Sequence, residues 1–94
     1  VLVDDTRRAT GVIDWGDLCF TDRSVDLGIA YAAFGGPSRA ALLDAYGPVD
    51  AATGLRARAV AAFLCAALAH HAQDVGDRGS ADAALAGLAR AIAP

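Results

Sequence analysis

Two carboxylates, Asp14 and Asp17, flank an aromatic residue and a glycine in the heptapeptide GVIDWGD at residues 11–17. A carboxylate that directly follows a short apolar strand is held on a fixed element, which suits a metal ligand. Because glycine tolerates backbone conformations that other residues resist, a sharp turn at Gly16 is predicted to aim Asp14 into a cleft. Asp17 would then support Asp14 from three residues further on. Since Asp and Gly also dominate ordinary turns, a turn that binds nothing is an equal alternative.

The type of ligand indicates the type of metal. Mg²⁺ is usually held by one or two carboxylates and keeps water or phosphate oxygens in its other positions, whereas a structural zinc site needs four protein ligands. One carboxylate at Asp14, supported by Asp17, therefore favours Mg²⁺ over zinc.

A β-hairpin is predicted to carry the acidic turn, which we define as residues 14–17. Short apolar runs at residues 1–3 and 11–13 have strand character, and the polar run DDTRRAT between them is typical of a hairpin connection. We therefore expect a two-stranded ribbon over residues 1–14. Such a ribbon is marginal alone and needs another element to pack against.

Four helices are expected after the turn, because the spacing of apolar residues becomes helical. They are predicted at residues 24–34, at 38–46, from residue 50 or 53 to 73, and at 80–92. Ser24, Ser38 and Ser80 are the expected N-caps of the first, second and last helix. The predicted fold class is mainly α with a short N-terminal β-hairpin. It forms one domain over residues 1–94, with the hairpin and turn at 1–17 and a helical subdomain at 24–94.

The core of the helical subdomain is predicted from large apolar residues at three- and four-residue spacings. These residues are Leu27, Tyr31 and Phe34, then Leu42, Leu43 and Tyr46, then Val60, Phe63, Leu64, Ala67 and Leu68, and finally Leu85, Leu88 and Ile92. The chain is 55% hydrophobic and 20% charged, a heavy apolar load for 94 residues. We therefore expect a homo-oligomer or a larger fold to cover the excess.

Composition excludes several classes of function. The net charge is −3, and the eight basic residues are all Arg and scattered, so no basic stripe is available for nucleic acid. The longest apolar run, residues 59–69, has 11 residues against about 20 needed to cross a bilayer, which predicts a buried helix and no membrane partner. Cys19 and Cys65 lack disulfide or metal spacing, as is typical of reduced thiols in a cytoplasmic protein. Ala-rich helices with Arg but no Lys indicate a high-GC bacterial source.

Two other groups have a chemical interpretation. His70 and Asp74 share one face of the third helix, but a metal site needs a third ligand, so ordinary helix-end histidines are the preferred interpretation. Cys19 lies two residues after the acidic turn, and a packed, inert thiol is expected there rather than a reactive one.

The string VLVDDTRRATGVIDWGDLCFTDRSVDLGIAYA, residues 1–32, resembles the segment after the catalytic loop in the aminoglycoside phosphotransferase and choline kinase-like family. The matching parts are residues 1–4, 11–17 and 21–28. Thr21 and Arg23 depart from the Gly and Pro that the family carries on either side of the position of Asp22. The resemblance implies that this chain forms part of the C-terminal lobe of a protein-kinase-like α+β fold.

The resemblance also implies roles for three carboxylates. Asp14 corresponds to the aspartate of the kinase Asp-Phe-Gly motif, the Mg²⁺ ligand that holds the ATP phosphates, with Trp15 in place of the Phe. Asp17 would support Asp14, and Asp26 would anchor the catalytic loop by accepting hydrogen bonds from its backbone. The alternative for Asp26 is a favourable charge in the first turn of its helix.

An enzyme of this family would use Mg²⁺ with ATP or GTP to phosphorylate a hydroxyl group of a small molecule. Its catalytic-loop aspartate, the partner asparagine and a phosphate-binding lysine are expected before Val1, and the 94 residues contain no Lys and no Asn. We therefore expect a partial domain, a C-terminal fragment with no catalytic residue of its own that is inactive alone. The alternative function is a noncatalytic helical module that oligomerises or binds a protein partner.

Overall fold

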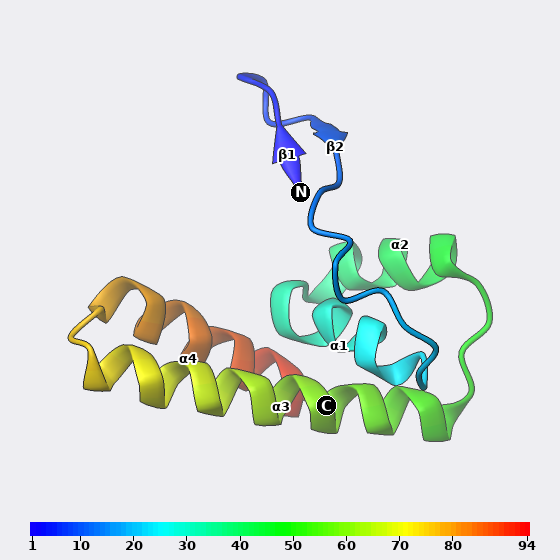
Figure 1. The fold of residues 1–94 in the computed structure, drawn as a ribbon. Helices are drawn as coiled ribbons and strands as arrows, with labels where there is room; N and C mark the ends of the chain where they lie inside the picture. The colour runs from blue at the N-terminus through cyan, green and yellow to red at the C-terminus, as the bar shows by residue number, and fades with distance from the viewer.

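The computed structural model describes residues 1–94 and contains a small hairpin followed by four helices (Figure 1). Strands β1 (Leu2–Val3) and β2 (Ala9–Gly11) precede helices α1 (Ser24–Ala33), α2 (Gly36–Tyr46), α3 (Ala51–Asp74) and α4 (Arg78–Ile92). Helices α3 and α4 lie along each other, and α1 packs against both. The predicted fold class, mainly α with an N-terminal β-hairpin, is confirmed.

The hairpin pairs Leu2 with Gly11 and Val3 with Ala9 in an antiparallel ribbon. Its turn is closed by Asp4, whose Oδ1 accepts hydrogen bonds from the N–H groups of Thr6 and Arg8, both at 2.9 Å. Because this closure is tight, pairing resumes at residue 9, two residues earlier than predicted. The hairpin packs against none of the four helices and stands apart from them in Figure 1.

Aspartates begin the two long helices. Asp50 is the N-cap of α3, where its Oδ1 accepts from the Thr53 N–H at 2.8 Å and its Oδ2 from the Thr53 hydroxyl at 2.7 Å. Asp77 makes the same two contacts with Ser80 at the start of α4, at 3.0 and 2.6 Å. The prediction that Ser80 is the N-cap is therefore wrong. The carboxylate three residues earlier offers two acceptor oxygens, which take both donors of the serine.

The predicted caps of the first two helices are also wrong. Asp22 accepts a hydrogen bond from the N–H of Ser24 at 2.9 Å, and Ser24 is a buried residue inside α1. Helix α2 begins at Gly36 with Pro37 in its first turn, so Ser38 lies within the helix. Proline is tolerated there because the first N–H groups of a helix have no partner in the helix. The Gly-Gly-Pro run at residues 35–37 therefore forms the start of α2.

Small residues form most of the contact between the helices. We define the small-residue seam as the buried residues Ala57, Ala61, Cys65, Ala69 and Ala72 of α3 with Ala81, Gly87 and Ala91 of α4. At Gly87 the approach is closest, because a Cβ there would lie 2.8 Å from the Cys65 Sγ and 3.2 Å from the Ala32 carbonyl oxygen. Helices this close leave room for Ala and Gly but not for large side chains.

The predicted core is wrong for most of its large residues. Leu27 of α1 is buried, at 2% exposure, and is the largest side chain to be enclosed so completely. Phe63, by contrast, is 72% exposed, and Leu64, Leu68, Leu85 and Ile92 also lie on the surface. Apolar spacing identified the helices correctly but favoured the wrong face of α3 and α4, since the Ala and Gly residues on the other face allow closer packing.

Three arginines tie the ends of the helices together. The Arg39 guanidinium donates to the Arg90 carbonyl at 2.9 Å, Arg90 donates to the Ala32 carbonyl at 2.8 Å, and Arg58 donates to the Ala91 carbonyl at 2.9 Å. These carbonyls lie in the last turns of α1 and α4, where the oxygens lack partners in the helix and the helix dipole is negative. The arginines therefore stabilise the helix ends without any carboxylate partner.

Helix α3 is long and apolar enough, by length and composition alone, to span a membrane. A single helix of this kind is weak evidence, because the core helix of a soluble protein passes the same test. Here one side of α3 packs against α1 and α4, which accounts for part of its apolar composition.

Candidate metal-binding site at the acidic turn

Asp14 has an unusual backbone conformation. Its φ is +68°, in the left-handed region that non-glycine residues seldom adopt, although Asp tolerates it better than most. The other non-glycine residue with positive φ, Arg7, lies in the tight hairpin turn. Gly16, where the sharp bend was predicted, does not have a positive φ. The bend therefore occurs at the candidate ligand itself, and such outliers cluster at functional sites.

Trp15 closes the acidic turn locally. Its indole Nε1 donates to the Val12 carbonyl at 3.1 Å, so the ring folds back along the chain, and the Leu18 N–H donates to the Trp15 carbonyl at 3.2 Å. Both bonds use backbone carbonyls, which leaves the carboxylates of Asp14 and Asp17 free for other partners.

The structure brings together the three carboxylates that the sequence singled out. Asp14, Asp17 and Asp26 line one cavity of about 340 Å³, with Trp15 and Leu18 as its other walls. Asp14 and Asp17 come from the turn, and Asp26 comes from the first turn of α1. The role of Asp26 as an anchor for a catalytic loop stays a prediction; the structure places Asp26 in the same cavity as the turn.

These three carboxylates accept no hydrogen bond and form no ion pair within the chain. Four other aspartates accept hydrogen bonds within the chain, and these bonds hold their pKa values below the ordinary value. Hydrogen bonds from Thr6 lower the pKa of Asp4, those from Ser24 lower that of Asp22, those from Thr53 lower that of Asp50, and those from Ser80 lower that of Asp77. Asp5, Asp44 and Asp82 also lack a partner within the chain, so what distinguishes Asp14, Asp17 and Asp26 is that they line one cavity.

The donor set of the cavity fits a hard divalent cation such as Mg²⁺. Carboxylate oxygens are its preferred protein ligands, and it needs only one or two of them. No three acidic, imidazole or thiol groups lie close enough together to hold a metal ion by themselves. Water, phosphate oxygens or other protein groups would therefore have to complete the shell, as the prediction of Mg²⁺ over zinc requires.

The other candidates lie elsewhere. The His70 Nδ1 is 3.4 Å from the Asp74 Oδ2, an exposed pair with no third ligand, which agrees with the interpretation as helix-end histidines. Cys65 is buried in the seam, but Cys19 is exposed, so the expectation of a packed thiol at Cys19 is wrong. Cys19 lies in the irregular segment after the turn, where no helix covers it.

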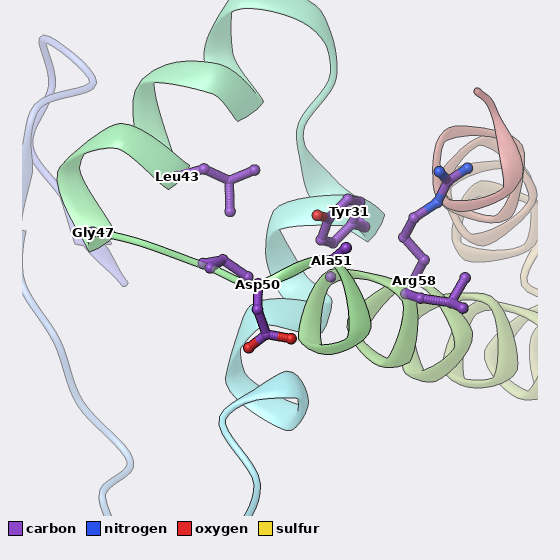
Figure 2. A pocket seen from close by; sticks show the side chains of 9 residues that line it. Tyr31, Leu43, Gly47, Asp50, Ala51 and Arg58 are labelled. Carbon is purple, nitrogen blue, oxygen red and sulfur yellow. The ribbon is translucent and has the colours of Figure 1, made fainter.

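The largest cavity, of about 630 Å³, is separate from the acidic one (Figure 2). Tyr31 of α1 and Leu43 of α2 stand on two sides of it, and the Asp50 carboxylate points away from both. Its walls are Tyr31, Leu43, Gly47, Val49, Asp50, Ala51, Gly54, Leu55 and Arg58. It shares no wall residue with the acidic cavity, and its Asp50 carboxylate is already bonded to Thr53.

Comparison with known proteins identifies the family. Neither the curated proteins nor the solved structures include a match to this chain. The sequence model of the phosphotransferase enzyme family matches residues 1–64, more than half of the chain, and this range includes the hairpin, the acidic turn and Asp26. The chain therefore belongs to the phosphotransferase enzyme family.

Proposed function

We propose that this chain supplies the Mg²⁺-holding part of an ATP-dependent phosphotransferase that acts on a hydroxyl group of a small molecule. The observation that carries the proposal is the left-handed Asp14, whose unpaired carboxylate shares a cavity with Asp17 and Asp26 in a chain of phosphotransferase sequence. An aspartate in an ordinary turn can also adopt a left-handed conformation, so the added support is the meeting of Asp14 with Asp17 and Asp26 in one cavity.

Each carboxylate has a distinct part in the proposal. Asp14 binds the cation directly. Asp17 supports Asp14 by placing a second negative charge beside the cation, and Asp26 accepts hydrogen bonds from the backbone of a catalytic loop. Asp14, supported by Asp17, would hold the Mg²⁺, which would supply positive charge to offset the negative charge that develops on the phosphates during transfer. The choice between ATP and GTP, and the identity of the hydroxyl acceptor, depend on other parts of the enzyme.

The remaining machinery must come from polypeptide outside these 94 residues. Phosphoryl transfer in this class uses a catalytic-loop aspartate with an asparagine partner and a lysine that contacts the phosphates. The chain contains neither Lys nor Asn. We therefore propose that it does not transfer phosphate alone.

A metal probe tests the proposal on the chain itself. Trp15 is the only tryptophan and lies within the acidic turn, so it can sensitise the luminescence of a bound Tb³⁺ ion. We expect Asp14→Asn to weaken Tb³⁺ binding by about tenfold or more, because Asn keeps the left-handed backbone but loses the charged ligand. Mg²⁺ should compete with Tb³⁺ in the wild-type chain.

The control is Asp44→Asn, which removes an exposed carboxylate of α2 that has no contact with the cavity. It carries the same change in net charge and should leave the Tb³⁺ midpoint within about twofold. Equal Tb³⁺ binding by the wild-type and Asp14→Asn chains would show that Asp14 is a turn residue only.

A noncatalytic helical module is the second candidate, favoured by the large apolar side chains that the helices leave on the surface, such as Phe63 and Leu68. Such a module would form a defined oligomer and show no Trp15-sensitised Tb³⁺ emission. Sedimentation velocity over a concentration series, combined with the Tb³⁺ titration, separates the two candidates.

A further inference from the structure

The segment between the hairpin and α1, residues 12–23, carries the acidic turn without regular structure of its own. The hairpin before it packs against no helix, so it does not hold the turn in place. The position of Asp14 and Asp17 relative to Asp26 on α1 therefore depends on how the end of this segment is fastened to the helical body.

Arg56 of α3 attaches the segment to the helical body through an ion pair with Asp22. Its guanidinium Nη2 lies 3.2 Å from the Asp22 Oδ2, while the other carboxylate oxygen of Asp22 accepts from the Ser24 N–H at 2.9 Å. Asp22 therefore joins the segment to the first turn of α1 through one oxygen and to α3 through the other. The same Nη2 also donates to the Thr53 hydroxyl at 3.0 Å.

The contact continues into the cap of α3. The Thr53 hydroxyl donates to Asp50, and the Arg23 guanidinium lies 3.8 Å from the same Asp50 oxygen and donates to the Pro48 carbonyl at 3.3 Å. Thr53 itself is buried. The residues Asp22, Arg23, Asp50, Thr53 and Arg56 thus form one connected group, which we call the clamp.

We propose that Arg56 is a positioning residue for the acidic cavity, which it serves by holding Asp22 so that the turn stays beside Asp26. The inference rests on the proposed function, since it assigns Arg56 to the same metal-binding cavity. Arg56 lines neither cavity, so it acts on the acidic cavity indirectly, through its ion pair with Asp22. Its side chain is about half exposed, and pairs at such surfaces contribute little to overall stability. Loss of the pair should therefore displace the turn and leave the helices folded.

Trp15-sensitised Tb³⁺ titration of Arg56→Gln tests the proposal. We expect the midpoint to rise about tenfold, with far-UV circular dichroism unchanged, because groups that orient metal ligands typically contribute that much to affinity. The direction of the change in the Tb³⁺ midpoint distinguishes positioning from electrostatics. Removal of a positive charge near three carboxylates should by itself strengthen cation binding, so weaker binding cannot come from electrostatics.

Arg78→Gln is the matched control, since Arg78 starts α4 and its side chain makes no hydrogen bond or ion pair. Its Tb³⁺ midpoint should stay within about twofold of the wild type or fall slightly.

Arg56→Lys keeps a positive charge opposite Asp22 and should recover part of the Tb³⁺ affinity. In a double-mutant cycle, Arg56→Gln should cause little further loss of Tb³⁺ affinity in a chain where Asp22→Asn has already removed its charged partner. If Arg56→Gln lowers helicity, Asp22→Asn carries the test, because it keeps an acceptor for the Ser24 N–H.

A second readout does not depend on metal. A nitroxide label on the exposed Cys19, in a Cys65→Ala background, reports the mobility of the segment. Arg56→Gln should narrow the electron paramagnetic resonance lines, and Arg78→Gln should not. Unchanged resonance lines in Arg56→Gln would overturn the proposal that Arg56 positions the turn. A Tb³⁺ midpoint that stays constant or falls in this variant would overturn it as well. Failure of the proposed function is distinguishable, since the wild-type and Asp14→Asn chains would then bind Tb³⁺ equally.

Discussion

Asp14 illustrates what one residue can and cannot reveal before its backbone is known. The position expected for it, directly after a strand, is wrong, because β2 ends at Gly11 and Asp14 lies in the irregular segment that follows. A metal-ligand role was predictable as a hypothesis from its carboxylate. Its conformation was not, since the glycine two residues later offered an obvious place for the bend. Only the positive φ at Asp14, with no positive φ at Gly16, shows that the bend lies at Asp14 itself.

At the residue scale, the engaged aspartates predict how stability depends on pH. Hydrogen bonds from Ser24, Thr53 and Ser80 lower the pKa values of Asp22, Asp50 and Asp77 in the folded chain. Groups with a lowered folded pKa stabilise the fold fully above their unfolded pKa, about 3.9, and lose that contribution as pH falls through the folded value. We expect the melting temperature to be flat near neutral pH and to fall below about pH 4.

The measurement is thermal unfolding by circular dichroism between about pH 7 and pH 2. Asp77→Asn keeps an acceptor at the start of α4 but does not titrate, so its melting temperature should fall less steeply in acid. Asp82→Asn, an exposed change on the same helix, should follow the wild-type curve. A wild-type melting temperature that rises below pH 4 would contradict this account.

At the element scale, the number and order of helices were predictable, but their caps and buried faces were not. Apolar spacing located all four helices because it reports helical period well. It placed Phe63 and Leu68 in the core because hydropathy ranks large side chains above alanine. The helices instead approach through alanine and glycine, an arrangement that depends on the distance between axes and is absent from any single helix.

A pair of truncations tests which face is buried. Leu27→Ala removes the largest enclosed side chain and should lower the free energy of unfolding by about 2 to 4 kcal/mol. Phe63→Ala removes a larger side chain that is mostly exposed and should change it by less than about 0.5 kcal/mol. Urea unfolding of both variants gives the comparison. A larger loss of unfolding free energy for Phe63→Ala than for Leu27→Ala would contradict this assignment and support the core that hydropathy predicts.

At the scale of the whole molecule, the hairpin and the helices form two bodies joined by one irregular segment (Figure 1). The heavy apolar composition predicted that the chain would not bury all its large side chains, and many are exposed, including those of the hairpin. Composition did not indicate which large side chains would be exposed, because their exposure depends on which helix faces meet at the small-residue seam. The clamp at Asp22 was equally hidden, since Arg56 lies 34 positions further along the chain.

The separation of the two bodies makes a simple prediction. Removal of residues 1–11 should change the free energy of unfolding of the helices by less than about 0.5 kcal/mol, because the hairpin contributes no packing to them. Thermal unfolding followed by circular dichroism measures this directly. A marked loss of helical stability in the shortened chain would show that the hairpin supports the helical body.

The small-residue seam also bears on how such a chain diverges. At Gly87 even one added methyl group meets a sulfur atom and a carbonyl oxygen, so a single enlarging change there cannot be absorbed unless its neighbours shrink. The outward face of α3, with Phe63 and Leu68, is free of that restriction within this chain. Enlarging changes should therefore be accepted least at the small alanines and the glycine of the seam, which are the positions that hydropathy ranks lowest as core.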